Sequence, residues 1–376
     1  MFHKVAYAKV SKLFKKLSNI YLIDTNKLFN VQLTTMSKKV LLTGGAGFIG
    51  HLVIKEVLEE TDWSITVIDR LSYAGSLDRI EYVLSKYDEK TKKRFKFFYH
   101  DLKAETHEGI VEDLANVNII LHVGASSHVT RSVKNPSIFI QDNVVGTFNL
   151  LELARKIDNL ELFYYFSTDE VFGPSDENAK FLEWDRYNSK NPYSATKAAA
   201  EELTIAYANT YSIPSLITHC SNVYGERQHS EKFIPNTIKK VLAGEEVLIH
   251  TDANNNPGER YYIYNEDLSK TILFLTKNYE EVRTKAFEIQ KKEPTKVNIT
   301  GSSLVSNLEV AELISKKLDK KLNYKLLNKD PERPGHDIKY GLNNELLESL
   351  NGVYDREFKD GIVNTVDWYL ENKKWL

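Results

Sequence analysis

Two clusters of reactive side chains suggest chemistry before any secondary structure is assigned. The run from Ser167 to Glu170, with the sequence Ser-Thr-Asp-Glu, places two adjacent carboxyl groups beside two hydroxyls. Further along, Tyr193 and Lys197 form a Tyr-x-x-x-Lys pair, a spacing that puts both on one helix face. Tyrosine with lysine suits oxidation of an alcohol by a nicotinamide, and an added acid and base suit removal of water. Together they predict oxidation, dehydration and reduction within one site.

The roles follow from ordinary acidities. A free tyrosine has a pKa of about 10 and is a poor base near neutral pH. The Lys197 ammonium and a positive nicotinamide ring would favour the phenolate, so Tyr193 could take the proton of a sugar hydroxyl. Asp169 and Glu170 could divide the acid and base roles of an elimination. Taken alone, the acid pair also fits a solvated turn, and Tyr-x-x-x-Lys also occurs on helices by chance.

A glycine-rich loop upstream favours the functional interpretation. Residues Gly44 to Gly50, GGAGFIG, lie between an apolar strand and a helix, where backbone N–H groups can cradle a pyrophosphate. Asp69 ends the second strand 19 residues past Gly50, where an acid can hold the adenosine ribose hydroxyls. A carboxylate there repels a 2′-phosphate, which favours NAD over NADP, although the neighbouring Arg70 weakens that preference.

Short apolar runs alternate with helical periodicity in the first part of the chain. The strands are expected at 40–42, 65–68, 95–99, 119–123, 162–166 and 215–219, and the helices at 48–60, 144–156 and 192–211. Continuous apolar strands separated by helices indicate an α/β fold with a parallel sheet covered on both faces. Such a doubly wound sheet binds ligands at the carboxyl ends of its strands, where every motif above falls.

The later part of the chain is less regular. We expect an NAD-binding Rossmann domain at 36–223 and a smaller, mainly substrate-binding lobe at 224–376, with some segments returning to the main sheet. Residues 284–296 are polar and are interpreted as a surface insertion. Residues 1–35 carry six lysines against one acid and are expected to lie outside the fold, with Met36 as the working start.

Composition excludes several classes of function. The formal net charge of −2 over 376 residues gives no indication of nucleic acid as a partner. The single cysteine, Cys220, rules out an internal disulfide and fits a reducing compartment, so a cytoplasmic location is expected. No Cys/His cluster has metal-ligand spacing, and no apolar stretch reaches the roughly 18 residues of a membrane span.

These motifs together resemble the extended short-chain dehydrogenase/reductases, and within them the nucleotide-sugar 4,6-dehydratases of the dTDP-glucose 4,6-dehydratase type. The resemblance covers about residues 38–370. It rests on the segments 43–50, 69–75, 126–132, 143–147, 167–173, 191–197, 222–225, 231–235 and 333–337. The glycine loop and the Tyr/Lys pair are typical of the whole superfamily, whereas the Thr-Asp-Glu run separates the dehydratases from the related epimerases.

The resemblance implies a redox-neutral cycle on a nucleotide-linked glucose. NAD takes hydride from C4 while Tyr193 takes the hydroxyl proton, supported by Lys197 and Thr168. Glu170 then removes the C5 proton, Asp169 protonates the leaving C6 hydroxyl, and hydride returns to C6. The product is a 4-keto-6-deoxy sugar, for which rhamnose and other deoxyhexoses are the usual destination. The resemblance also implies a homodimer formed by the helices near 144–156 and 192–211.

The resemblance assigns the remaining site residues by position. The cofactor would contact Gly44, Gly47, Phe48, Ile49, Gly50, Asp69, Asp101, Leu102, Ala125, Tyr193 and Lys197. The sugar would contact Ser127 and Thr168, and the nucleotide diphosphate would contact Asn222, Lys232, Arg260, Asn298, Arg333 and Asp337. Arginine forks and an ammonium suit a diphosphate. The chain departs from the family pattern at Gly124, Asp142 and Ser221, where Asp142 stands at a position that is often threonine, and the choice between thymine and uracil stays open.

Two other functions compete with the dehydratase. A nucleotide-sugar 4-epimerase or decarboxylase would share the Tyr193/Lys197 pair but has no need of Asp169 and Glu170. A non-catalytic NAD-binding scaffold on the same fold could lose Tyr193 or Lys197 without consequence, yet both are present. The paired acids therefore favour the dehydratase.

Overall fold

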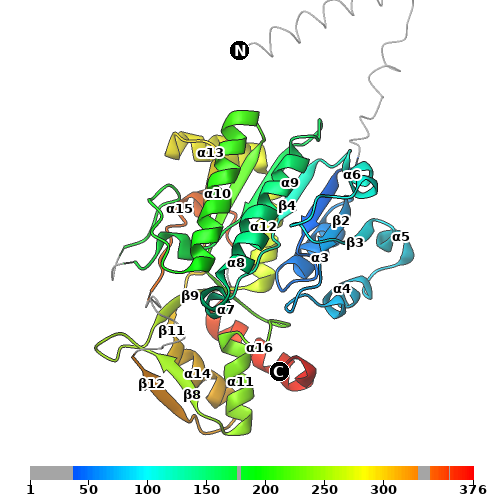
Figure 1. Cartoon of the computed structure of the whole chain (residues 1–376). Coiled ribbons are helices and arrows are strands. Elements are labelled where there is room, and N and C mark those ends of the chain that lie inside the picture. The colour runs from blue at the N-terminus through cyan, green and yellow to red at the C-terminus, as the bar shows by residue number, and fades with distance from the viewer. Residues whose placement is uncertain (1–36, 176–178, 329–338, 355) are drawn as a thin grey trace, which may run out of the picture. The chain divides into compact units, whose positions relative to one another are not determined.

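Seven short strands of mostly apolar residues form a parallel sheet in the unit from Lys38 to Leu376 (Figure 1). The computed structural model describes residues 37–175, 179–328, 339–354 and 356–376. The strands are β1 (Lys39–Thr43), β2 (Ser64–Asp69), β3 (Phe95–Tyr99), β4 (Ile119–His122), β5 (Leu162–Phe166), β6 (Ser215–Cys220) and β10 (Thr295–Ile299). Their order is β10-β6-β5-β4-β1-β2-β3, and every neighbouring pair is parallel. This is the doubly wound arrangement predicted from the sequence.

Both faces of the sheet are buried because successive strand residues point to opposite sides. On β1, Leu42 joins one apolar core with helices α3, α12 and α13, and Leu41 joins the other with α6, α9 and α10. These helices are α3 (Gly50–Glu60), α6 (Glu108–Leu114), α9 (Gly146–Ala154), α10 (Pro192–Tyr211), α12 (Asn265–Lys277) and α13 (Tyr279–Gln290). The shorter helices around the sheet are α4 (Leu77–Leu84), α5 (Glu89–Lys92), α7 (Val129–Lys134), α8 (Pro136–Phe139), η1 (Ile140–Val145), η2 (Asp169–Phe172) and α15 (Glu345–Ser349).

A smaller group of elements lies beyond the carboxyl ends of the strands, at the bottom of Figure 1. It contains β7 (Asn222–Tyr224), β8 (Val247–His250), β9 (Glu259–Tyr264), β11 (Leu304–Ser306), β12 (Tyr324–Leu327), α11 (Phe233–Ala243), α14 (Asn307–Lys317), α16 (Phe358–Glu371) and η3 (Lys373–Trp375). Its core is rich in aromatic rings, and the ring of Tyr224 lies 4.9 Å from that of Phe358 and 5.9 Å from that of Tyr262. Such aromatic pairs hold the small lobe together.

One predicted element is wrong. Residues 284–296 are not a surface insertion, because they complete α13 and begin β10, which pairs with β6 in the main sheet. The segment looks polar because only one face of α13 is buried, through Val282 and Ala286, and because β10 carries the buried Lys296. The predicted domain boundary at residues 223 and 224 falls inside β7, and β10, α12 and α13 all pack with the main sheet.

Membrane-spanning helices and metal-binding clusters are both absent from the described residues. None of their helices is both long and apolar enough to cross a bilayer. Within the same ranges, no three or more histidine, cysteine, aspartate or glutamate side chains are grouped so that they could hold a metal ion.

Candidate active site

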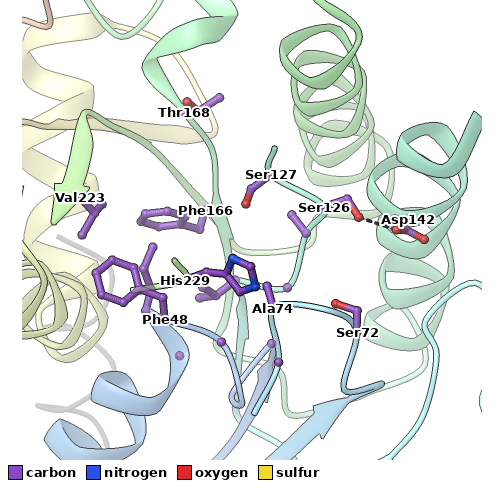
Figure 2. A pocket seen from close by; sticks show the side chains of 18 of the residues that line it. Phe48, Ser72, Ala74, Ser126, Ser127, Asp142, Phe166, Thr168, Val223 and His229 are labelled. Carbon is purple, nitrogen blue, oxygen red and sulfur yellow. Dashed lines mark hydrogen bonds between the residues drawn. The ribbon is translucent and has the colours of Figure 1, made fainter. Parts of the chain in front are cut away.

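A pocket opens at the carboxyl ends of β1, β2, β4 and β5, and nearly all predicted site residues line it. Figure 2 shows side chains from separate segments around it: Phe48, Ser72, Ser127, and Phe166 with Thr168 at the end of β5. The predicted residues that line the pocket are Gly44, Gly47, Phe48, Ile49, Gly50, Asp69, Asp101, Leu102, Ala125, Ser127, Thr168, Asp169, Glu170, Tyr193, Lys197, Asn222 and Lys232. The glycine loop, the acid pair and the Tyr/Lys pair, which are far apart in sequence, therefore share one cavity.

The glycine loop forms the floor of the pocket at the start of α3. Gly44 has φ +73°, and a Cβ there would lie 2.6 Å from the Cα of Gly124. At Gly50 a Cβ would lie 2.2 Å from the carbonyl oxygen of Gly44. The loop can therefore fold this tightly only with glycines, and it leaves a cradle of backbone at a helix N-terminus, which suits a pyrophosphate. These residues fit the phosphates of a dinucleotide such as NAD.

Asp69 is held at the edge of this cradle. Its Oδ2 accepts a hydrogen bond from the Ala46 backbone N–H at 3.0 Å, and its Oδ1 accepts one from the Leu71 N–H at 2.8 Å. The two bonds fix the carboxylate beside the glycine loop and leave lone pairs for further donors. The side chain is thus placed where an acid can receive the ribose hydroxyls of a bound dinucleotide.

Helix α10 carries the Tyr/Lys pair into the pocket. The helix begins with a reciprocal cap, in which the Asn191 side chain accepts from the Ser194 N–H and the Ser194 side chain accepts from the Asn191 N–H. Pro192 occupies the first turn, where its missing N–H has no cost. Tyr193 and Lys197 are both buried, and the Lys197 Nζ donates to the carbonyl oxygen of Phe166 at 2.6 Å. The capped helix end therefore fixes both groups at the end of β5.

Burial sets the acidities of this pair. Burial lowers the pKa of Lys197 to about 7. Burial, with the negative charges of Glu170 and Asp169, raises the pKa of Tyr193, whereas a hydrogen bond with the Thr168 side chain opposes that rise. Tyr193 is thus a protonated phenol in this pocket by itself, so a positive charge beside it is needed before it can act as a base.

The acid pair lies in η2, the turn that follows β5. The Thr168 hydroxyl accepts from the Glu170 N–H at 3.4 Å and donates to Asp169 Oδ1 at 3.1 Å. Asp169 is 5% exposed, and burial together with the charge of Glu170 raises its pKa to about 7. The Glu170 Oε2 accepts from Asn191 Nδ2 at 2.9 Å. The two carboxyl groups therefore have different environments, and Asp169 can hold a proton near neutral pH.

Polar groups from the small lobe reach the other side of the pocket. The Lys232 Nζ donates to the Ser127 carbonyl oxygen at 3.3 Å, and Asn222 lies exposed at the start of β7. Arg260 is buried on β9 with its guanidinium 4.8 Å from the ring centre of Tyr340, and its charge favours the ionised form of Asp169. Arg260 is thus near the acid pair but does not line the cavity.

The predicted substrate residue Asn298 is held inside the fold and does not line the pocket. Asn298 is fully buried in β10, with its Oδ1 bonded to His219 and its Nδ2 donating to the carbonyl oxygens of Phe181 and Asn343. Its amide is used inside the fold, so the assignment of Asn298 to the nucleotide diphosphate is corrected to a structural role. Arg333 and Asp337 lie outside the described residues.

The structure also places residues at the pocket that sequence reasoning gave no role. Tyr73, His229 and Glu231 line the cavity, with the Tyr73 and His229 rings 5.4 Å apart. Arg131 lies 3.7 Å from the Tyr73 ring centre, and its Nε donates to Glu231 at 3.1 Å. These residues come from two loops and from helix α7, so only the fold brings them together. Asn191 could have been found, because an asparagine before Pro-Tyr-Ser indicates a helix cap.

Fold and site together define an extended short-chain dehydrogenase/reductase with an added acid pair. Residues 41–359 match the family of GDP-mannose 4,6 dehydratase, and the chain belongs to this family. It is 32% identical over 372 residues to a dTDP-glucose 4,6-dehydratase of Escherichia coli, a match that covers 90% of this chain and 95% of that enzyme. It is also 32% identical to a trifunctional UDP-glucose 4,6-dehydratase of Arabidopsis thaliana, over 91% of this chain and 48% of that larger protein.

Solved structures agree with this placement. The dTDP-glucose 4,6-dehydratase of Streptomyces venezuelae, crystallised with NAD, superposes with a TM-score of 0.77 at 29% identity, over 90% of this chain and 98% of that one. A UDP-glucose 4-epimerase of Thermus thermophilus shares the fold, with a TM-score of 0.73 at 23% identity, over 88% of this chain and 99% of that one. The predicted family, doubly wound fold, NAD cofactor and 4,6-dehydratase activity are thereby confirmed.

Proposed function

We propose that this enzyme removes water from a nucleoside-diphosphate glucose, either dTDP-glucose or UDP-glucose, to give the 4-keto-6-deoxy sugar. The sugar would lie between Tyr193 and the acid pair. Bound NAD would supply the redox chemistry, accepting hydride from C4 and returning it to C6. The protein side chains then have four proton transfers to perform, the fourth of which returns the C5 proton from Glu170 as hydride reaches C6. The sugar is thereby oxidised, dehydrated and reduced without net consumption of the cofactor.

The first transfer belongs to Tyr193, which takes the proton of the C4 hydroxyl as that carbon is oxidised. Without cofactor, burial and the charges of Glu170 and Asp169 raise the pKa of Tyr193. The Lys197 ammonium and the positive charge of the bound cofactor must therefore both favour the phenolate. The hydrogen bond with Thr168 also lowers the pKa of Tyr193 and so favours the phenolate. Oxidation is therefore coupled to cofactor binding, because the base becomes effective only when that charge is present.

The second and third transfers belong to the acid pair. The 4-keto group acidifies the C5 proton, which Glu170 removes, while Asp169 protonates the leaving C6 hydroxyl. The observation that carries this assignment is the raised pKa of Asp169, about 7, which keeps a proton on a carboxyl group near neutral pH. A group that must donate a proton is most effective when its pKa lies near the working pH. Glu170 instead receives a hydrogen bond from Asn191, which leaves it as the acceptor of the pair.

Substrate contacts follow from the positions around the cavity. We propose that Ser127 and Thr168 hold the sugar and that Asn222 and Lys232 hold the nucleotide diphosphate. Arg260 adds positive charge near the acid pair, and we propose that this charge also serves the two phosphates. Arg333 and Asp337 are retained as proposals for the nucleotide end.

We further propose that the enzyme is a cytoplasmic homodimer. The apolar side chains of Ile140 on η1 and Phe148 on α9 are 48% and 43% exposed. Phe148 lies in the helix at 144–156 that is expected to form the dimer, and Ile140 lies just before it. Exposed apolar side chains gathered on one helix pair suit an interface between copies. Light scattering coupled to gel filtration should give twice the chain mass. Replacing both residues by glutamate should shift the protein to monomer, and a native protein that runs as monomer would reject the dimer.

The substrate is tested by incubating the enzyme with NAD and each of the two sugar nucleotides. The expected product is lighter than its substrate by one water, without net formation of NADH. The faster of the two substrates identifies the preferred base. A galactose-configured product of unchanged mass would identify an epimerase instead, the class to which the Thermus thermophilus enzyme belongs.

A further inference from the structure

A cluster of four charged residues lines or borders the cofactor side of the pocket, next to Asp69. The Arg70 guanidinium donates through Nη1 to Asp142 Oδ1 at 2.7 Å and to Asp101 Oδ2 at 3.2 Å, and through Nη2 to Asp142 Oδ2. Lys103 lies 3.3 Å from Asp101 and 3.6 Å from Asp142. Arg70, Asp101 and Asp142 all line the cavity. An arginine at this end of the second strand would ordinarily be free to receive a 2′-phosphate.

We propose that Asp142 is a specificity-determining residue, which enforces NAD over NADP by holding the Arg70 guanidinium in a two-pronged ion pair. Both prongs of the fork that a phosphate would need are already bonded to one carboxylate. The carboxylate is 5% exposed, whereas the guanidinium is 25% exposed. Turning Arg70 toward a phosphate would leave a buried carboxylate with only the Ser126 hydroxyl and the more distant Lys103 ammonium as partners, which is unfavourable.

The backbone around Asp142 is built to hold it there. Asp142 lies in η1, a π-helical segment between α8 and α9, and such segments often occur at functional sites. Ser126 Oγ donates to Asp142 Oδ2 at 2.5 Å, the bond drawn as a dashed line in Figure 2. The side chain of the next residue, Asn143, binds the backbone of the same Ser126. Its Oδ1 accepts from the Ser126 N–H at 2.8 Å, and its Nδ2 donates to the Ser126 carbonyl oxygen at 3.0 Å.

The side chains of neighbouring residues on a regular α-helix point about 100° apart and do not usually bind the same partner residue. Here Asp142 and Asn143 both reach Ser126, and Asn143 also bonds to Thr196 on α10. The carboxylate of Asp142 is thus positioned independently of Arg70 and is ready to receive it. Asp69 repels a 2′-phosphate directly, whereas Asp142 removes the cation that could compensate for that repulsion.

The test compares binding of NADPH and NADH, and therefore does not depend on which sugar is converted. NADPH is titrated against protein carrying NADH, and displacement is followed by energy transfer from tryptophan to bound NADH. We expect Asp142→Thr to lower the ratio of the NADPH and NADH dissociation constants at least tenfold, because Arg70 then keeps only its single contact with Asp101 and its Nη2 can make one charge-assisted contact with the phosphate. The control Lys103→Ala removes a neighbouring charge without freeing Arg70, and should leave the ratio within twofold of the native value.

The double variant Arg70→Ala/Asp142→Thr separates two explanations. If Arg70 is the group released, the gain in NADPH affinity disappears in the double variant. A gain that persists there would mean that simple loss of negative charge is responsible, and would overturn the proposal. An unchanged ratio in Asp142→Thr would overturn it as well. Should Asp142→Thr fail to fold, as judged by its thermal unfolding, Asp142→Asn keeps the shape without the charge and is judged by the same ratio.

Discussion

Two buried carboxyl groups, Asp169 at the pocket and Glu201 on α10, have pKa values shifted in opposite directions. Asp169 and Glu201 are 5% and 0% exposed. Burial and the neighbouring charge of Glu170 raise the pKa of Asp169 to about 7. Burial would also raise the pKa of Glu201, but ion pairs with His219 and Lys296 outweigh it and lower that pKa. The partners of a buried carboxyl, rather than its depth, decide whether it carries a proton.

The two groups are also mechanically connected. Phe172 ends η2, the turn that carries the acid pair, and its ring lies 4.6 Å from the ring of His219. His219 Nε2 and Lys296 Nζ lie 3.0 and 2.9 Å from Glu201 Oε1. A cluster held by ion pairs at Glu201 Oε1 thus supports a turn whose own Asp169 makes no ion pair within the described ranges. The ion pairs of Glu201 make that cluster rigid. The raised pKa of Asp169 lets that carboxyl group keep a proton that it can donate.

The largest effect is expected when the catalytic pair loses its base. Glu170→Gln should lower turnover about a thousandfold, since a positioned general base contributes about 10²–10⁴. The sugar should still be oxidised, so reduced cofactor should accumulate on the enzyme, visible as absorbance at 340 nm. Glu202→Gln, an exposed glutamate on α10, is the control and should turn over normally. Normal turnover in Glu170→Gln would remove Glu170 from the base role.

The paired cluster should respond in stability rather than in chemistry. Glu201→Gln leaves the Lys296 ammonium buried without a counter-charge, so the free energy of unfolding should fall by about 3–5 kcal/mol. Urea unfolding measures this as a lower midpoint. The double variant Glu201→Gln/Lys296→Met removes both charges and should recover most of the loss. If the single variant unfolds at the native urea concentration, the cluster is not a stabilising unit.

The same comparison explains what the sequence could and could not predict. Asp169 and Tyr193 were predictable because each follows a local rule, a position just past a strand end and a one-turn spacing on a helix. The cluster around Glu201 was not, because its members come from α10, β6 and β10, and only tertiary packing brings them together. Lys296 in particular lies in a segment whose polar composition favours a surface position.

In the small lobe, too, local patterns could be predicted from the sequence and tertiary contacts could not. Its helices near 233–243 and 307–317 follow from apolar periodicity, but β8 and β12 have only four residues each, which is too short for a pattern to stand out. Asn298 was assigned to substrate by its position in a motif. Its neighbour across the sheet, His219, instead binds its amide, and nothing in the local sequence indicates that partner.

A pH series sharpens the contrast for Asp169. Below pH 7 this carboxyl is protonated and can donate to the leaving hydroxyl, and above pH 7 its protonated fraction falls tenfold per unit. Asp169→Asn should lower turnover about a hundredfold at pH 6. The ratio of native to variant turnover should then fall as the pH rises through about 7. The effect of Lys197 is common to both proteins and cancels in the ratio, whereas loss of the Asp169 charge also lowers the pKa of Tyr193 in the variant. A ratio that stays constant would mean that Asp169 does not act as the acid.

The smallest effect is expected at Asn191, which joins the two catalytic clusters. Its Oδ1 accepts from the Ser194 N–H at 2.9 Å and caps α10, while its Nδ2 donates to Glu170 at 2.9 Å. Serine retains a capping oxygen but is too short for the second contact. Asn191→Ser should therefore unfold like the native enzyme while kcat falls about tenfold with little change in KM, because Glu170 loses its orientation. Asn191→Ala loses the cap as well, and its stability should fall by about 1 kcal/mol. Equal kcat in the native and serine proteins would restrict Asn191 to capping.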